Sequence, residues 1–213
     1  MHIDLDYLRR IGKRESPASI LKEPKFLQAQ TLFFSVIADL HGTVDFDIAD
    51  MREVHAVAAL GDVKGKRVLD IGCGSMKPYV LTDSFRDLYP PFFAEMLTKL
   101  GANVTGIDIR ENPTARYDHR VLDLTKPRWM TTLDPPYDII TCLNLFNAPN
   151  SLFEHNADLC ESIMNDMHSL LAADGLLIVT LRDKTIDPKA SVESKKFKLI
   201  HLDGNCAWLL PQT

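Results

Sequence analysis

A short apolar segment followed at once by two glycines constrains this chain more than any other feature. Val68, Leu69 and Ile71 form a run that is too short for a helix and suits a strand buried on both faces. Gly72 and Gly74 come directly after it. Glycines in this position let the backbone turn sharply and let a ligand approach without a Cβ in the way. The segment predicts a buried strand of an α/β protein, ending in either an ordinary turn or a ligand-binding turn.

Acidic residues stand beside the ends of the predicted strands. Asp70 lies just before the two glycines, where a carboxylate can accept hydrogen bonds from a bound cation or from loop amides. A second strand, Asn103 to Ile107, ends in Asp108, and a third, Val121 to Leu122, ends in Asp123. A carboxylate at the tip of the second parallel strand can accept hydrogen bonds from both vicinal hydroxyls of a ribose. An exposed acid at a strand end, without a ligand, is the alternative for Asp108.

The acidic residue followed by Gly-x-Gly resembles motif I of the class I S-adenosylmethionine (AdoMet) methyltransferases. The stretch Gly-Ala-Asn-Val-Thr-Gly-Ile-Asp, which ends at Asp108, and a helix end Leu-Leu-x-x-Asp-Gly before a strand from Leu176 to Leu181 resemble the same family. The resemblance covers about residues 66–210. It implies a doubly wound α/β fold, with a mostly parallel seven-stranded sheet and a final antiparallel hairpin, here Phe197 to Leu202 and Ala207 to Leu210.

The resemblance also implies that AdoMet is the cofactor and that residues at the carboxyl ends of the strands hold it. The matching positions are Gly72 and Gly74 near its amino-acid portion, Asp108 near its ribose, Asp123 and Leu124 near its adenine, and Asn144 near its methionine end, with Asp70, Cys73 and Ile109 as further cofactor-binding residues. A structural turn is the alternative for Asp123.

The strand from Tyr137 to Leu143 delivers Asn144 and Asn147 to the same edge, and we expect these two residues to orient the substrate. An asparagine side chain can donate and accept hydrogen bonds, so Asn144 suits a substrate nitrogen or oxygen as well as the cofactor. Residues 137–147 also resemble the equivalent strand of the DREV-type protein-histidine methyltransferases, in which an Asn and a nearby acidic residue orient the target imidazole. Asn147 stands at the position of that acidic residue and cannot act as a carboxylate base. This resemblance is therefore the second choice.

The tetrapeptide Asp134-Pro135-Pro136-Tyr137 matches the one with which nucleic-acid amino-methyltransferases grip a target amine. In those enzymes the tetrapeptide follows the fourth strand. Here the apolar run from Ile139 to Leu143 comes after it. We therefore expect a turn on the entry side of the strand, at the wrong end of the sheet for the chemistry.

Two segments outside the motifs are expected to shape the substrate side. Residues 1–60 are predicted to form an N-terminal helical cap ahead of a core at 61–213, and its helices either cover the ligand cleft or pack on the sheet. Residues 76–90 form an insertion after the glycines, before a helix that starts at Pro91. The insertion either contacts the substrate or forms a rigid surface loop.

Composition limits the partners and the compartment. The net charge is −5, which argues against a nucleic-acid partner held through phosphates and favours a small molecule. The four cysteines include no CxxC pair, so we expect reduced thiols and no metal site. No apolar run approaches the roughly 20 residues that span a bilayer, and the start lacks the pattern of a signal peptide. We expect a cytoplasmic protein without a membrane partner.

The leading hypothesis is an enzyme that transfers the methyl group of AdoMet to a nucleophilic nitrogen or oxygen of a small molecule. A peptide or protein N-methyltransferase of the histidine type and a non-catalytic AdoMet-binding module are the alternatives. A nicotinamide-dependent dehydrogenase would require Gly-x-Gly-x-x-Gly, and Lys77 stands where the third glycine belongs.

Overall fold

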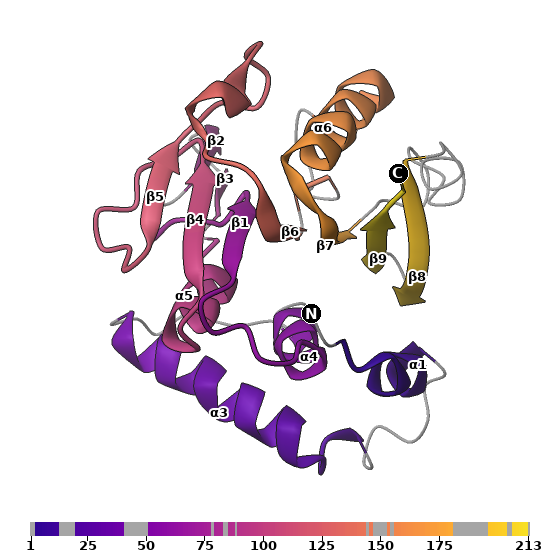
Figure 1. The fold of residues 1–213 in the computed structure, drawn as a ribbon. Coiled ribbons are helices and arrows are strands. Elements are labelled where there is room, and N and C mark those ends of the chain that lie inside the picture. The colour runs from indigo at the N-terminus through magenta and orange to yellow at the C-terminus, as the bar shows by residue number, and fades with distance from the viewer. Residues whose placement is uncertain are drawn as a thin grey trace.

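The computed structural model of the protein describes most of the chain and centres on one large sheet. The described residues are 3–12, 20–40, 51–77, 79–82, 85–87, 89–143, 145–146, 153, 156–180, 196–203 and 206–212. Within them, seven strands form one sheet in the order β5-β4-β1-β6-β7-β9-β8 (Figure 1). Their bounds are β1 Arg67–Ile71, β4 Asn103–Asp108, β5 Asp118–Val121, β6 Tyr137–Cys142, β7 Leu171–Thr180, β8 Phe197–Asp203 and β9 Cys206–Pro211.

The strands of this sheet run parallel except near its C-terminal edge. β1 pairs in parallel with both β4 and β6, and β5 and β7 extend these pairs in parallel. β9 runs antiparallel to both β7 and β8. The predicted α/β fold with a final antiparallel hairpin is confirmed. Because parallel strands end on the same side, the segments that follow β1, β4, β5 and β6 meet at one edge of the sheet, which we call the carboxyl edge.

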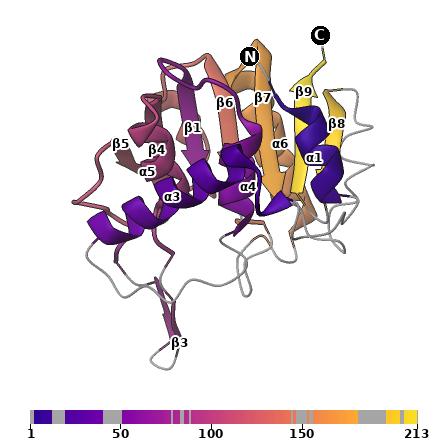
Figure 2. The ribbon, with the colours of Figure 1, turned by 90° about the horizontal axis from the view of Figure 1, so that it is seen from below.

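Helices cover both faces of the sheet, and each face has its own hydrophobic cluster. One face carries α1 (Leu5–Gly12), α3 (Pro24–Asp39), α4 (Met51–Ala59) and α5 (Phe92–Lys99), and the other carries α6 (Ala157–Leu170) and the 3-10 helix η2 (Trp129–Thr132). Figure 2 shows α1, α3 and α4 in front of the strands. Successive strand residues point to opposite faces, so Val68 joins the first cluster and Leu69 joins the second.

The N-terminal helices lie on one face of the sheet, where α1 packs against β8 and α3 packs against α4 and α5 (Figure 1). α3 buries Phe26, Ala29, Phe33 and Val36, which recur at the spacing of one helix face. These side chains share one hydrophobic cluster with strand residues such as Val68. Of the two arrangements that the sequence left open for these helices, packing on the sheet is therefore present at α1. A separate domain that ends at residue 60 stays a prediction.

The third strand was predicted at the wrong residues. β5 spans Asp118–Val121 and not the apolar pair Val121 to Leu122. Its position follows the backbone register with β4, in which Asp108 lies opposite Val121. β5 is an edge strand, and its half-exposed polar residues give no apolar run that a sequence pattern could detect. As a result, Asp123 lies in the turn beyond the strand and does not directly follow it.

The apolar spacing from Ser151 to Leu171 predicts a long helix, and in the structure this helix ends at Leu170. The helix α6 begins after Asn156, whose side chain accepts a hydrogen bond of 3.0 Å from the amide of Leu159, and residues 151 and 152 lie outside the described residues. Leu171 already belongs to β7, where it pairs with Tyr137 ahead of a bulge. Pairing with a neighbouring strand, and not helix propensity, sets this boundary.

The insertion after the glycines contains a small hairpin. β2 (Tyr79–Thr82) and β3 (Phe85–Asp87) pair in antiparallel fashion, and β3 projects away from the body of the molecule (Figure 2). Pro91 occupies the N-cap of α5, so the helix starts one residue later than predicted. The described residues of the insertion therefore include regular structure, and the chain enters the insertion from the end of β1 at the carboxyl edge.

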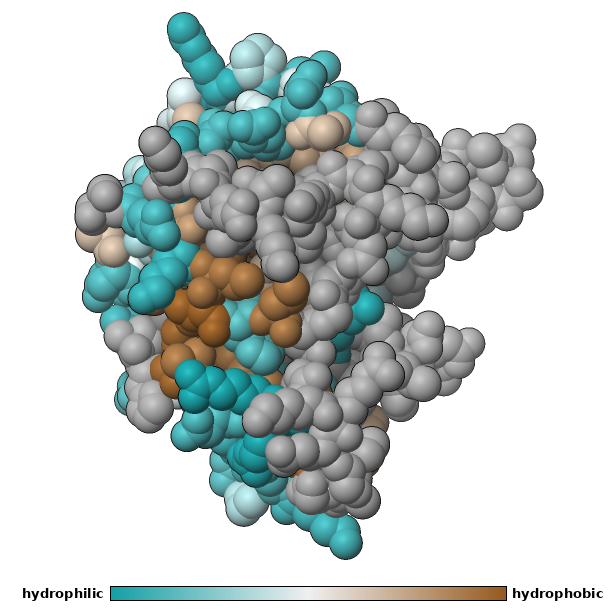
Figure 3. Space-filling view, turned by 90° about the vertical axis from the view of Figure 1, so that its right-hand side faces the viewer, coloured by the Kyte–Doolittle hydropathy of each residue, from teal (hydrophilic) through white to brown (hydrophobic). Residues whose placement is uncertain are grey.

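The surface beside β8 has a partly apolar character. Figure 3 looks onto this side of the molecule, where hydrophobic residues gather at mid-height. On β8, Leu202 is 38% exposed, and Leu199 and Ile200 are half-buried.

None of the helices built from the described residues has both the length and the apolar character required to cross a bilayer.

Candidate active site

The turn after β1 requires both of its glycines. Gly72 and Gly74 have φ angles of +69° and +89°, a region that side chains strongly disfavour. A Cβ on Gly74 would lie 2.3 Å from the carbonyl oxygen of Tyr89. The amide of Gly72 donates a hydrogen bond of 2.8 Å to the carbonyl of Ile107, so the turn crosses from β1 to the end of β4. The predicted sharp turn at the end of the first strand is confirmed.

Asp108 joins this turn to the end of β4. Its carboxylate accepts a hydrogen bond of 3.1 Å from the amide of Gly74. It also accepts bonds from the backbone amide, Nε and Nη2 of Arg110, at 2.9, 2.9 and 3.3 Å. The side chain of Asp108 is only 9% exposed. The structure thus brings the two sequence motifs into direct contact and holds the strand-tip carboxylate inside the site, away from bulk solvent.

Asp70 lies beneath the turn, inside the sheet. It is 3% exposed and accepts a hydrogen bond of 2.6 Å from Oγ1 of Thr141 on β6. Burial raises the pKa of Asp70 from 3.8 to about 7, the nearby charge of Asp108 raises it further, and the bond from Thr141 lowers it. A carboxyl group in this state can gain or lose a proton near neutral pH.

The side chain of Cys73 is buried and contacts two half-buried polar side chains, those of Tyr117 and His119. Its Sγ lies 3.7 Å from Nδ1 of His119 and accepts a hydrogen bond of 3.5 Å from the Tyr117 hydroxyl. Nε2 of His119 lies 2.9 Å from the carbonyl of Arg110, which can only accept, so Nε2 is the donor in this hydrogen bond. Burial raises the pKa of the Cys73 thiol well above its usual range, so the thiol stays neutral.

Sequence reasoning missed Tyr117 and His119, although Gly106 offered a signal. Gly106 lies within β4, where glycine is uncommon. A Cβ there would meet the Tyr117 ring at 2.4 Å and the Cys73 sulfur at 2.9 Å. A glycine inside a predicted strand therefore indicated that another group packs against its backbone.

Asp123 and Leu124 lie in the turn after β5. Asp123 Oδ1 accepts hydrogen bonds from the amide and the hydroxyl of Thr125, at 2.9 and 2.7 Å, and these bonds hold the pKa of Asp123 below its usual value. The amide of Leu122 donates to the carbonyl of Asp108 at 2.9 Å, which places this turn beside the end of β4. Leu124 packs against the second hydrophobic cluster. The local turn is present, and an adenine contact stays a prediction.

The predicted substrate residues Asn144 and Asn147 lie outside the described residues. Their neighbour Leu145 is described, and its Cδ1 lies 3.2 Å from the position of a Cβ on Gly72. The segment after β6 therefore reaches the glycine turn. Phe146 is 1% exposed and packs edge-on against Phe153 at 5.7 Å between ring centroids, so it belongs to the second hydrophobic cluster.

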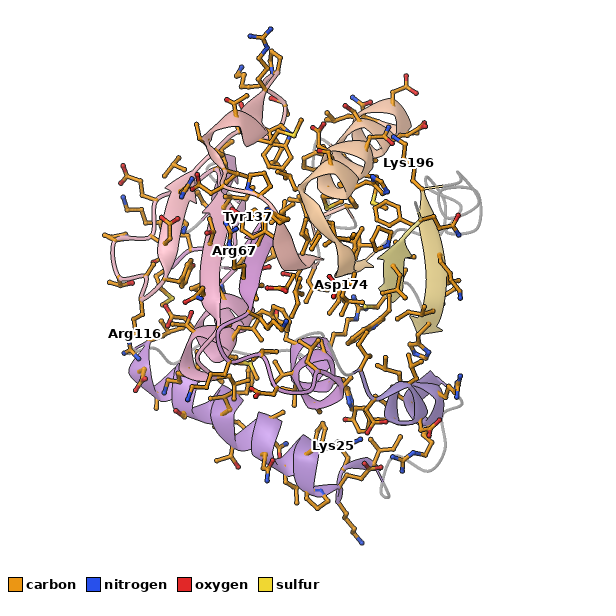
Figure 4. All side chains as sticks on the ribbon, in the orientation of Figure 1. Lys25, Arg67, Arg116, Tyr137, Asp174 and Lys196 are labelled. Atoms are coloured by element: carbon orange, nitrogen blue, oxygen red, sulfur yellow. The ribbon has the colours of Figure 1, made fainter. Side chains whose placement is uncertain are left out.

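The tetrapeptide at 134–137 lies at the opposite edge of the sheet. Tyr137 is the first residue of β6, and the Asp134 carbonyl accepts a hydrogen bond from Nη2 of Arg67 at the start of β1. Figure 4 shows Arg67 beside Tyr137, and the guanidinium carbon lies 5.3 Å from the ring centroid. A cavity of about 360 Å³ opens among these residues. The prediction that the tetrapeptide lies away from the carboxyl edge is confirmed.

The fold and the site together define a class of protein. A parallel sheet in this order with an antiparallel last strand, a glycine turn after its first strand and an acid at the tip of the second are the features of a class I AdoMet-dependent methyltransferase. The comparison with protein families agrees, because the model of the methyltransferase domain matches residues 46–207. The chain belongs to this methyltransferase family.

Curated relatives point in the same direction. A ubiquinone biosynthesis O-methyltransferase from Actinobacillus pleuropneumoniae is 30% identical over an alignment of 136 residues that covers 57% of this chain and 48% of the relative. The protein of the same name from Pseudomonas aeruginosa is 27% identical over an alignment of 155 residues that covers 68% of this chain and 55% of the relative. The chain thus spans about half the length of the curated relatives it matches.

Solved structures share the fold. A 16S rRNA N2 methyltransferase from T. thermophilus, in complex with AdoMet and guanosine, has a TM-score of 0.50 and 18% identity over 81% of this chain and 45% of its own. The MycE methyltransferase of the mycinamycin biosynthetic pathway, in complex with Mg and S-adenosylhomocysteine, has a TM-score of 0.51 and 13% identity over 90% and 49% of the two chains. These identities are low, so the two structures support the fold alone.

Proposed function

We propose that this protein transfers the methyl group of AdoMet to a nucleophilic oxygen or nitrogen of a small molecule. One observation carries the proposal: the amide of Gly74 and the carboxylate of Asp108 meet at 3.1 Å at the carboxyl edge of parallel strands. This is the edge at which open α/β sheets bind ligands. The names of the two curated relatives favour an oxygen of a small molecule as the acceptor.

The residues at this edge suit AdoMet chemically. The glycine turn at Gly72 and Gly74 presents backbone without side chains to the amino-acid portion. The Asp108 carboxylate suits the hydroxyls of a ribose. Ile109 is 54% exposed and Val121 is 50% exposed, and their apolar side chains beside Asp108 offer a surface that a flat adenine ring would cover. We assign Asp123 and Leu124 to the same adenine, as the family resemblance implies.

The residues of this chain have a limited chemical task. Bound AdoMet supplies a methyl group that its sulfonium already activates, so the protein must align the acceptor with it and exclude water. We assign the alignment to Asn144 and Asn147, which follow β6 at the carboxyl edge. We assign Asp70 to the region of the cofactor's ammonium group, whose positive charge would favour the ionised carboxylate.

The test is a transfer assay with methyl-labelled AdoMet on separated small-molecule and protein fractions of a cell extract, after calorimetric titration of the protein with AdoMet and with NAD. The proposal expects binding of AdoMet but not NAD, and label in the small-molecule fraction. Label in the protein fraction would show that the methyl acceptor is a peptide or protein and not a small molecule. Tight binding with no labelled product in either fraction would overturn the catalytic assignment and indicate a binding module.

A further inference from the structure

The carboxylate assigned to the ribose is already occupied by a side chain of the same protein. Oδ1 of Asp108 accepts from the amide and the Nε of Arg110, and Oδ2 accepts from the amide of Gly74 and from Nη2 of Arg110. A carboxylate offers about four lone-pair sites, so these four bonds use its capacity. The Arg110 side chain is 13% exposed, which protects the ion pair from screening by solvent.

Arg110 also contacts the segment that leads into the inserted hairpin. Its Nη1 donates a hydrogen bond of 2.9 Å to the carbonyl of Lys77, and its guanidinium carbon lies 5.9 Å from the Tyr89 ring centroid. The same segment is fastened next to Arg110, because Oγ of Ser75 donates to the carbonyl of Glu111 at 2.6 Å. One guanidinium therefore connects the strand-tip carboxylate with both ends of the insertion.

Two of the four bonds to Asp108 can be exchanged without moving the backbone. The amides of Gly74 and Arg110 are fixed by the turns that contain them, whereas Nε and Nη2 belong to a side chain that can rotate. A ribose offers two vicinal hydroxyls, which would need the two acceptor sites that Nε and Nη2 now fill. Two hydrogen bonds from Arg110 to Asp108 would thus be replaced by two from the ribose hydroxyls.

We propose that Arg110 competes with the ribose of the cofactor for Asp108 and thereby sets the affinity of the site. The proposal rests on the proposed function, which assigns the ribose to Asp108. Binding displaces Nε and Nη2 from the carboxylate, and the movement also releases the carbonyl of Lys77. Arg110 thus opposes cofactor binding and couples it to the segment that precedes the hairpin.

The experiment compares Arg110→Met with the matched control Lys77→Met by calorimetric titration. Both variants remove one positive charge near the turn, but the Lys77 ammonium pairs with Glu111 at 2.6 Å and not with Asp108. The probes are AdoMet and S-adenosylhomocysteine, which share the ribose but differ by the sulfonium charge. We expect Arg110→Met to bind both probes roughly tenfold more tightly, because the variant lacks the charged hydrogen bonds that compete with the ribose for Asp108. Lys77→Met should change only AdoMet binding, and by less.

Weaker binding by Arg110→Met than by Lys77→Met, or equal binding, would overturn the competition. Tightening for AdoMet but not for S-adenosylhomocysteine would also overturn it, because the effect would then be one of net charge. Arg110→Lys serves if the Met variant does not fold, since one ammonium cannot replace both guanidinium bonds and tighter binding is again expected. Asp108→Asn separates the two proposals: unchanged affinity in that variant removes the ribose assignment itself, whatever Arg110 does.

Discussion

Thr141 on β6 donates a hydrogen bond of 2.6 Å to the buried carboxylate of Asp70 on the adjacent strand β1. The two residues lie 71 positions apart in the chain and meet because β1 and β6 pair in parallel. The bond compensates only part of the cost of burying the carboxylate, and the pKa of Asp70 rises to about 7. This relationship makes the stability of the protein depend on pH.

Asp70 should make the protein less stable as the pH rises from about 4 to about 7. In this window the folded protein holds the Asp70 proton and the unfolded chain, with its ordinary pKa of 3.8, releases it. Stability from this group is full below the unfolded value and is lost as the pH passes the folded value, by up to about 4 kcal/mol. Urea unfolding of the wild type and of Asp70→Asn at several pH values measures the effect. A difference between the two proteins that stays constant with pH would contradict it.

Gly74→Ala should destabilise the protein and abolish AdoMet binding. The new Cβ would lie 2.3 Å from the Tyr89 carbonyl oxygen in a backbone with φ of +89°. Gly65→Ala is the matched control, because Gly65 has φ of +72° but nothing within 4 Å of its Cβ position. We expect Gly74→Ala to cost about 2 kcal/mol more than the control in thermal or urea unfolding. Equal costs would mean that the clash relaxes freely.

Cys206 should react first with a thiol reagent in the native protein. It is half-buried, whereas Cys73, Cys142 and Cys160 are buried and burial raises the pKa of each of their thiols. Mass spectrometry after brief labelling identifies the modified residue, and labelling in urea confirms that all four thiols can react. Early modification of Cys73 would show that the glycine turn opens more easily than its packing suggests.

Asp134→Ala should leave methyl transfer unchanged, while Asn144→Ala should reduce kcat/KM by about 10- to 100-fold. Asp134 lies at the edge of the sheet opposite the glycine turn, and its side chain is 76% exposed where it pairs with Arg120. The stability cost of Asp134→Ala should be less than about 0.5 kcal/mol, as for other exposed ion pairs. A large loss of activity in Asp134→Ala would contradict the assignment of methyl transfer to the carboxyl edge and would place it at the opposite edge of the sheet.

Local patterns determined the parts of the site that depend on backbone shape. The length of the apolar run at 67–71 and the two glycines after it indicated a buried strand and a turn with positive φ, and both are present. The position of Asp108 at a strand tip followed in the same way. These features were predictable because strand length, side-chain alternation and glycine conformation are properties of neighbouring residues. The edge strand β5, which lacks an apolar run, was located wrongly for the same reason.

By itself, then, the sequence determined the fold class, the glycine turn after β1 and the carboxylate at the tip of β4. Only the tertiary structure decided what those residues contact: Thr141 on Asp70, Tyr117 and His119 on Cys73, and Arg110 between Asp108 and Lys77. Most of these contacts join residues far apart in the chain, and they depend on strand register and on the path of the turns. Side-chain partners of this kind form only after the sheet has paired, so no local pattern specifies them.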